Sequence, residues 1–98
     1  MEYVELGKTG LRVSRLCFGA LVIGPLQKNM PVRDGAAVIR AALERGVNFI
    51  DTAELYGTYG HIREAVKGLG EKPVVATKSY AYTAGGAAES VEKARKEL

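Results

Sequence analysis

The chain has 98 residues, of which 47% are hydrophobic and 26% charged, and its 14 Lys and Arg against 11 Asp and Glu give a formal net charge of +3. This composition is typical of a globular protein, and the length allows a single domain. No apolar run approaches the roughly 20 residues that cross a bilayer. The first residues carry no secretory signal. We therefore expect a cytoplasmic protein. The few excess positive charges are scattered and not interleaved with aromatic side chains, which argues against nucleic-acid binding.

The chain contains one cysteine, Cys17. A single cysteine excludes an internal disulfide and a metal site built from several cysteines. Its neighbours Leu16 and Phe18 indicate a small buried hydrophobic side chain. We expect no metal site.

The first 30 residues predict short strands and a loop. Residues 3–6 and 11–13 are rich in strand-forming residues, and a glycine-flanked polar turn between them predicts a hairpin over residues 1–13. Residues 16–19 indicate a short apolar strand. Residues 20–30 have the composition of a loop.

The next segment predicts a helix that begins near Pro31, because proline suits the first helical turn. Gly46 is placed to end that helix. The expected apolar face contains Val38, Ile39, Ala42 and Leu43.

Two further strand and helix pairs follow. Residues 47–50 and 74–77 are short apolar runs that indicate buried strands. A second helix is expected to run to about Gly70, with Ile62, Ala65, Val66 and Leu69 on one face. A loop containing Gly85 and Gly86 is expected to lead into a third helix, with Ala87, Val91, Ala94 and Leu98 on one face.

The predicted fold is α/β: an N-terminal hairpin over residues 1–13, then β-α-β-α-β-α over residues 14–98. This alternation favours parallel strands joined by right-handed crossovers. Three such units leave both sheet edges open, whereas a complete (β/α)₈ TIM barrel takes about 250 residues. The chain ends on Leu98 without a helix stop signal. We therefore expect residues 1–98 to be the first part of a larger barrel, truncated after Leu98.

Two charged residues close neighbouring strands. Side chains alternate along a strand, so Phe49 and Asp51 share one face, as do Ala76 and Lys78. If the strands are neighbours, Asp51 and Lys78 emerge together at their carboxyl ends, where an ion pair is expected because a lone charge there is costly. Active sites of βα-barrels are built at that edge. The alternative is that each is a surface charge that ends its strand.

Tyr56 lies five residues beyond Asp51, in the loop before the second helix. A phenol beside an ammonium group has its phenolate stabilised, and it can then donate a proton to a carbonyl oxygen. The alternative is that Tyr56 packs its ring and points its hydroxyl at water, as we expect of Tyr59 and Tyr82.

Three separated segments resemble the aldo-keto reductase family, and together the resemblance covers essentially the whole chain. Residues 46–57 (GVNFIDTAELYG) resemble the family signature, residues 6–14 (LGKTGLRVS) its N-terminal hairpin, and residues 74–78 (VVATK) its third barrel strand. The resemblance implies the first three βα units of a (β/α)₈ barrel. It also implies hydride transfer from a nicotinamide cofactor, NADPH or alternatively NADH, to an aldehyde or ketone.

The resemblance also implies residue roles. Tyr56 would be the proton donor, Lys78 the lysine that lowers its pKa, and Asp51 the aspartate that holds the lysine. The positions expected near the nicotinamide are Gly19, Ala20, Leu21 and Asp51. Many relatives have threonine where this chain has Ala20.

His61 does not match the family's catalytic histidine, which follows the fourth barrel strand. We expect His61 to face solvent or to begin the second helix. Because that fourth strand and most of the cofactor site lie outside residues 1–98, we expect the isolated chain to be inactive. The alternative function is a non-catalytic relative, since the family fold also serves as a channel-associated subunit.

Overall fold

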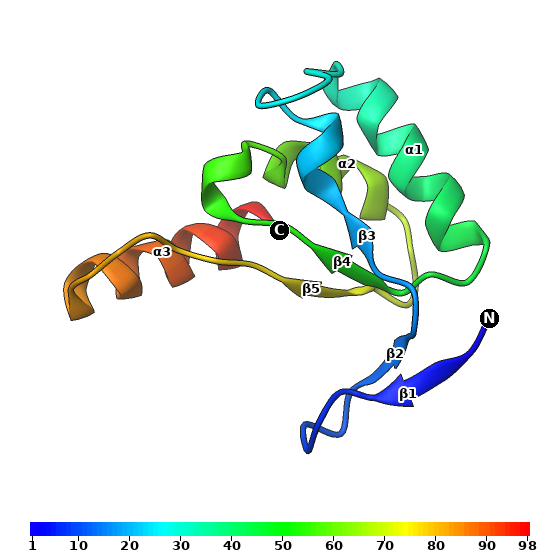
Figure 1. Ribbon diagram of the computed structural model, residues 1–98. Coiled ribbons are helices and arrows are strands. Elements are labelled where there is room, and N and C mark those ends of the chain that lie inside the picture. The colour runs from blue at the N-terminus through cyan, green and yellow to red at the C-terminus, as the bar shows by residue number, and fades with distance from the viewer.

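Three parallel strands form the central sheet of the computed structural model, which describes residues 1–98 (Figure 1). They are β3 (Phe18–Gly19), β4 (Phe49–Asp51) and β5 (Val74–Ala76), in that spatial order. Each neighbouring pair is parallel and is joined by a crossover that contains a helix. The predicted β-α-β-α-β-α order is therefore confirmed.

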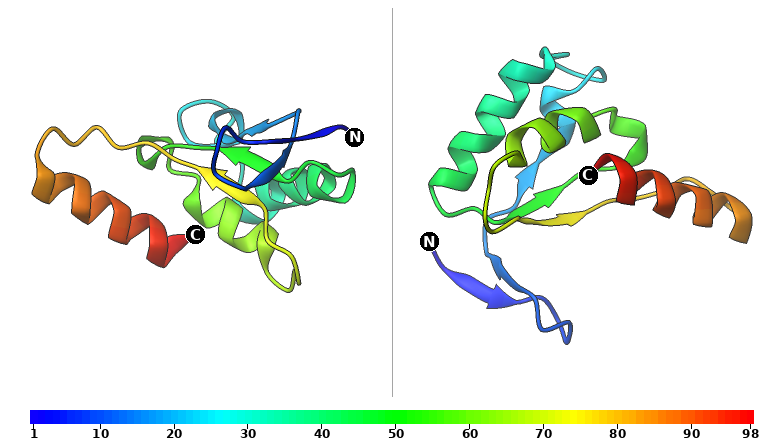
Figure 2. Two further views of the ribbon diagram at one scale, coloured as in Figure 1. Left: turned by 90° about the horizontal axis from the view of Figure 1, so that it is seen from below. Right: turned by 180° about the vertical axis from the view of Figure 1, so that it is seen from behind.

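The three helices are α1 (Val32–Glu44), α2 (Tyr59–Val66) and α3 (Ala84–Glu97). Figure 2 shows all three on the same side of the sheet, so the opposite face of the strands is left uncovered. Helix α3 contacts α2 but has no buried residue. The hydrophobic core therefore lies between the sheet and the first two helices.

Strand alternation decides which side chains reach that core. Phe18, Ile50 and Val75 occupy one row across the sheet, and Ile50 is completely buried beneath the helices. Their chain neighbours point to the uncovered face. Cys17 belongs to that second row and is exposed, so the prediction of a buried cysteine was wrong. The sequence around Cys17 is apolar on both sides, but only one side of this strand is covered.

Helix α1 begins and ends as predicted. Pro31 is its N-cap, and the helix ends with Arg45 at the C-cap. Gly46 follows with φ of +97°, a left-handed conformation that glycine adopts without the steric cost of a Cβ. On the predicted apolar face, Ile39 is completely buried whereas Val38 is 41% exposed.

The other helical elements differ from prediction in three places. Residues 20–30, predicted as a loop, begin with a 3₁₀ turn over Ala20–Ile23. Helix α2 ends at Val66 rather than near Gly70. Gly85 and Gly86 lie inside α3 rather than in a loop, because the Thr83 side chain caps the helix by accepting a hydrogen bond from the Gly86 N–H at 3.0 Å.

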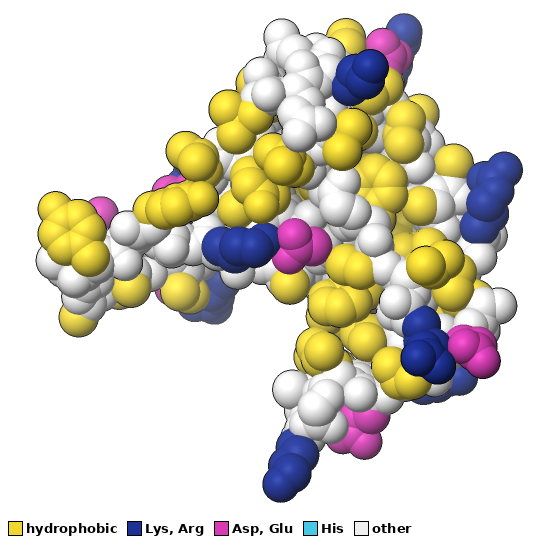
Figure 3. All heavy atoms as spheres, in the orientation of Figure 1, with side chains coloured by type: hydrophobic (Ala, Val, Ile, Leu, Met, Phe, Trp, Pro, Cys, Tyr) yellow, Lys and Arg dark blue, Asp and Glu magenta, His cyan; other side chains and the backbone are white.

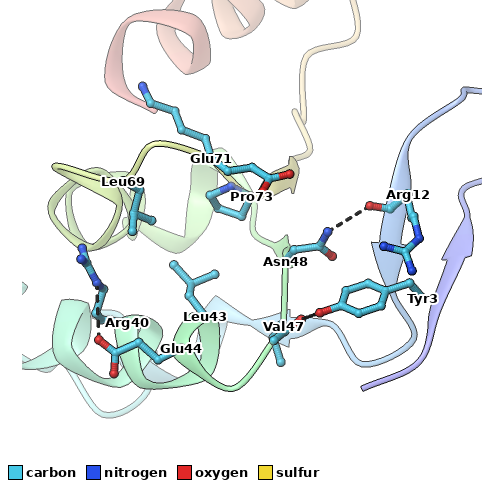
Figure 4. A pocket seen from close by; sticks show the side chains of 12 residues that line it. Tyr3, Arg12, Arg40, Leu43, Glu44, Val47, Asn48, Leu69, Glu71 and Pro73 are labelled. Carbon is cyan, nitrogen blue, oxygen red and sulfur yellow. Dashed lines mark hydrogen bonds and ion pairs between the residues drawn. The ribbon is translucent and has the colours of Figure 1, made fainter.

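The hairpin, β1 (Tyr3–Glu5) paired antiparallel with β2 (Arg12–Ser14), confirms the prediction for the N-terminus. Asn48 attaches it to the sheet: its side chain accepts from the Ser14 N–H at 2.6 Å and donates to the Arg12 carbonyl at 3.0 Å. The Tyr3 hydroxyl donates to the Gly46 carbonyl at 2.7 Å. Figure 4 shows Tyr3, Arg12 and Asn48 around a pocket of about 370 Å³ at the amino ends of β4 and β5. The hydrogen bonds of Tyr3 and Asn48 cross this pocket, which therefore lies along the seam between hairpin and sheet.

The contrast between Ile39 and Val38 yields a stability prediction. Ile39→Val deletes one buried methylene and lowers the free energy of unfolding by about 1 kcal/mol. Val38→Ala, on the exposed side of the same helix, changes it by less than about 0.5 kcal/mol. Urea denaturation measures both. Equal losses in the two variants would contradict this description of the core.

Candidate active site

The centre of the candidate site is an ion pair at the carboxyl ends of β4 and β5. Asp51 is the last residue of β4 and pairs in register with Ala76, two residues before Lys78 on the same face. The Lys78 Nζ lies 2.8 Å from one carboxylate oxygen of Asp51 and 2.9 Å from the other. It also donates to the Thr52 carbonyl at 2.7 Å. The predicted Asp51–Lys78 ion pair is confirmed.

The contact with Asp51 shifts the pKa of Lys78. The hydrogen bond to Asp51 raises the pKa of Lys78 above its ordinary value of 10.5, against a smaller opposing effect of desolvation. The Asp51 charge and Tyr56 add to the increase. The Lys78 and Asp51 side chains are 49% and 42% exposed. Water therefore screens the pair, and its contribution to stability is small.

Tyr56 reaches the ion pair from a 3₁₀ turn over Glu54–Tyr56 that follows β4. Gly57 ends the turn with φ of +67°, which reverses the chain. The Lys78 Nζ lies 5.2 Å from the centroid of the Tyr56 ring, within the range of a cation–π interaction. The ammonium faces the ring. The structure thus brings Asp51, Tyr56 and Lys78 together.

Two threonines beside this site were not predicted from the sequence. Thr52 and Thr58 flank the segment that carries Tyr56, and both are completely buried. Their hydroxyl oxygens lie 2.7 Å apart, a hydrogen-bond distance. Thr52 lies two residues after the predicted strand over residues 47–50, and this position was the one available signal. The partnership with Thr58 depends on how the loop folds.

Tyr59, the first residue of α2, is 5% exposed, and its hydroxyl lies 2.6 Å from that of Thr77. The prediction that this hydroxyl points at water was therefore wrong. For Tyr82, which is 97% exposed, the same prediction is confirmed. Tyr59 differs because the start of α2 packs against the end of β5.

Gly24 supports the Tyr56 turn through a close approach rather than through its φ. A Cβ at this position would lie 2.5 Å from the Thr58 methyl carbon and 2.7 Å from the Tyr56 carbonyl oxygen. Any larger residue would push the turn away. Gly24 thus fixes the outer side of the segment that carries Tyr56.

The residues predicted to lie near a nicotinamide do not all reach the uncovered face of the sheet. Gly19 pairs in register with Asp51, and a Cβ built on it would meet nothing within 4 Å, so the face above this strand end has room for a flat ring. Ala20 is completely buried and packs in the hydrophobic core. Its side chain therefore does not line the uncovered face. Leu21 follows in the 3₁₀ turn and is half-buried.

The thiol of Cys17 lies on the same face as Gly19. Partial burial raises its pKa above the ordinary 9.0, and the charge of Asp51 adds to the increase. The neighbouring Lys78 acts in the opposite direction. The thiol is therefore protonated near neutral pH.

His61 lies in the first turn of α2, as one of the two predictions for it stated, but it does not face solvent. It is 6% exposed, and its Nε2 lies 2.8 Å from the Met30 carbonyl oxygen. Its ring packs on Gly35 of α1, where a Cβ would lie 2.5 Å from the ring carbon Cδ2. The prediction of a solvent-facing histidine was wrong because the face of α2 that carries it is the one that α1 covers.

The surroundings of the site are open. A hollow of about 420 Å³ lies next to the Tyr56 turn. Its lining residues are Glu54, Leu55, Ser79, Tyr80, Ala81 and Ser90. Figure 3 shows that the uncovered face is largely hydrophobic, with a basic and an acidic side chain in contact near its middle.

The chain contains no cluster of three or more metal-ligating side chains. None of its helices has the length and apolar character needed to cross a membrane.

The Asp51–Lys78 pair generates a prediction for pH dependence. Asp51→Asn returns the pKa of Lys78 towards 10.5, because the hydrogen bond to the carboxylate is the largest cause of its increase. A raised folded-state pKa stabilises the fold below 10.5, and this contribution disappears as the pH rises through the raised value. The stability difference between wild type and Asp51→Asn should therefore close at alkaline pH.

NMR titration of the Lys78 side chain measures the shift. Glu97→Gln, which removes the partner of Lys93 at 3.7 Å in α3, serves as the matched control and leaves the Lys78 titration unchanged. An identical Lys78 titration in wild type and Asp51→Asn would disprove the assignment of the cause.

Comparisons with known proteins agree with the resemblance in the sequence. Residues 15–98 match the model of the Aldo/keto reductase family. An uncharacterized oxidoreductase of Bacillus subtilis, YrpG, is 38% identical over 90 residues, which cover 82% of this chain and 27% of that protein. The L-galactose dehydrogenase of Arabidopsis thaliana is 36% identical over 106 residues, which cover the whole of this chain and 32% of that protein.

A solved structure supports the same assignment. The putative aldo-keto reductase from Pseudomonas aeruginosa superposes with a TM-score of 0.82 at 31% identity, over 98% of this chain and 41% of that one. The chain thus spans about a third or less of the two curated relatives. With a family match over 84 of its 98 residues, the chain belongs to the aldo/keto reductase family.

Proposed function

We propose that the protein to which this chain belongs reduces an aldehyde or ketone with a nicotinamide cofactor. One observation carries the proposal: Lys78 holds Asp51 at 2.8 Å and faces the Tyr56 ring at 5.2 Å, at the carboxyl edge of parallel strands. In βα-barrels this edge is where catalytic residues gather. Membership of a family of oxidoreductases supports the same chemistry.

Each of the three residues has a distinct role in this proposal. Tyr56 donates the proton from its hydroxyl to the carbonyl oxygen as that oxygen gains negative charge. Lys78 stabilises the phenolate that remains, because its ammonium lies against the ring. Asp51 orients Lys78 through both carboxylate oxygens. The nicotinamide, when bound, supplies the hydride to the carbonyl carbon.

The cofactor would lie over the uncovered ends of β3 and β4. Gly19 leaves open space there, next to Asp51. The backbone around Ala20 and Leu21 would border the same space. NADPH is the first candidate cofactor and NADH the second, on the resemblance to the family.

We further propose that the whole protein is a cytoplasmic (β/α)₈ barrel, of which residues 1–98 supply three βα units. The uncovered sheet face and the unpaired outer edges of β3 and β5 agree with that arrangement. The remaining units would supply the rest of the cofactor site and a substrate-orienting histidine. Residues 1–98 alone should therefore show no carbonyl-dependent oxidation of the cofactor.

The proposal predicts that Tyr56→Phe in the full-length protein lowers kcat by about 10²- to 10⁴-fold, because the proton donor is lost. Cofactor binding should remain intact, since the ring stays in place. Cofactor oxidation in the presence of an aldehyde measures the first quantity, and a fluorescence titration the second.

Tyr82→Phe is the matched control, since this tyrosine is 97% exposed, and it should leave turnover unchanged. Near-normal turnover by Tyr56→Phe would refute the proposed role. A full-length protein without turnover on any carbonyl would favour a non-catalytic member of the family.

A further inference from the structure

Two buried hydroxyl groups lie beneath the Tyr56 turn and have no part in the proposed proton transfer. The Oγ1 atoms of Thr52 and Thr58 are 2.7 Å apart, and both residues are 0% exposed. Thr52 follows Asp51 at the end of β4, and Thr58 precedes α2. The hydrogen bond therefore closes the base of residues 53–57, the segment that carries Tyr56.

Thr52 also contacts the other half of the site. Its carbonyl accepts the Lys78 ammonium at 2.7 Å, and its N–H donates to the Ala76 carbonyl at 2.8 Å. Thr52 thus fixes both the position of the Lys78 ammonium and one end of the segment that carries Tyr56. A shift of Thr52 relative to Thr58 would change the distance between the proton donor and the ammonium.

The segment has little freedom to compensate for such a shift. Gly24 lies against its outer side, close to the Tyr56 carbonyl and the Thr58 methyl group. A second hydroxyl pair, Tyr59 with Thr77 at 2.6 Å, ties the start of α2 to the residue before Lys78. The Tyr56 segment is therefore held between strand ends on one side and Gly24 on the other.

We propose that the Thr52–Thr58 hydrogen bond is a positioning device that sets the placement of Tyr56 against Lys78 for proton transfer. This inference rests on the proposed function. The physical reason is distance: two hydroxyl oxygens approach to 2.7 Å, whereas carbon groups in van der Waals contact stay about 3.5–4.0 Å apart. Only a hydrogen-bonded pair gives this spacing at the base of the segment.

The test is the double variant Thr52→Val/Thr58→Val in the full-length protein. Valine has nearly the shape of threonine, and replacing both partners leaves no buried hydroxyl unpaired, so thermal stability should fall less than in Thr58→Val alone, which leaves the Thr52 hydroxyl unpaired. The spacing must widen by about 1 Å, because methyl groups replace the oxygens. We expect kcat to fall by about tenfold to a hundredfold, with KM for carbonyl and cofactor unchanged.

Two variants separate positioning from packing. Thr58→Ser keeps the hydroxyl but deletes the methyl group beside Gly24, so it should lower thermal stability while kcat stays within about twofold of wild type. Thr9→Val makes the same chemical change in the exposed hairpin turn, where the Thr9 hydroxyl donates to the Leu6 carbonyl at 2.6 Å. It should leave kcat unchanged.

The outcomes decide whether the Thr52–Thr58 hydrogen bond positions Tyr56 or only contributes to packing. Wild-type kcat in the double variant overturns this inference, and so does a set of variants in which kcat simply follows thermal stability. Thr58→Val alone breaks the same hydrogen bond, and its kcat should fall by the same factor with KM unchanged. This single variant tests the inference if the double variant does not fold. An inactive Tyr56→Phe beside a fully active double variant defeats only this inference, whereas an active Tyr56→Phe defeats the proposed function.

Discussion

The ammonium of Lys78 is the contact on which the candidate site depends. It donates to both carboxylate oxygens of Asp51 and to the Thr52 carbonyl, and it lies against the Tyr56 ring. These groups come from one strand end and the loop that follows it, while Lys78 lies two residues beyond the end of the next strand, β5. The geometry therefore requires the β4–β5 register in which Asp51 pairs with Ala76. A slip of one residue would turn Lys78 to the helical side and leave Asp51 without its partner.

The two ends of the strands, called here the amino edge and the carboxyl edge of the sheet, have different roles in this chain. At the amino edge, Asn48, Tyr3 and their backbone partners use their hydrogen bonds to attach the hairpin. The polar groups of Tyr3 and Asn48 in the pocket there are therefore already paired. At the carboxyl edge, Lys78 and Asp51 are about half exposed and face open space above Gly19. The charged pair at this second edge lies beside Tyr56, and the proposed chemistry belongs there.

The uncovered sheet face explains several features of the fold. A parallel sheet is normally covered on both faces, or closed on itself as a barrel. Here the helices cover one face, while Cys17 and a largely hydrophobic surface remain on the other (Figure 3). Helix α3 buries none of its residues, and only its end at Leu98 packs against the core. These features agree with the proposal that residues 1–98 supply three βα units of a larger closed sheet, and so does the length of the relatives.

The sequence by itself determined the features that depend on local chemistry. Alternation along two strands was enough to predict the Asp51–Lys78 pair, and a glycine in left-handed conformation was correctly placed at Gly46. Tertiary structure decided the rest. Cys17 is exposed and His61 is buried because burial depends on which face another element covers, and neither pattern carries that information. The Thr52–Thr58 hydrogen bond likewise exists only because a loop returns to the strand end, and a loop's path is set by what it packs against.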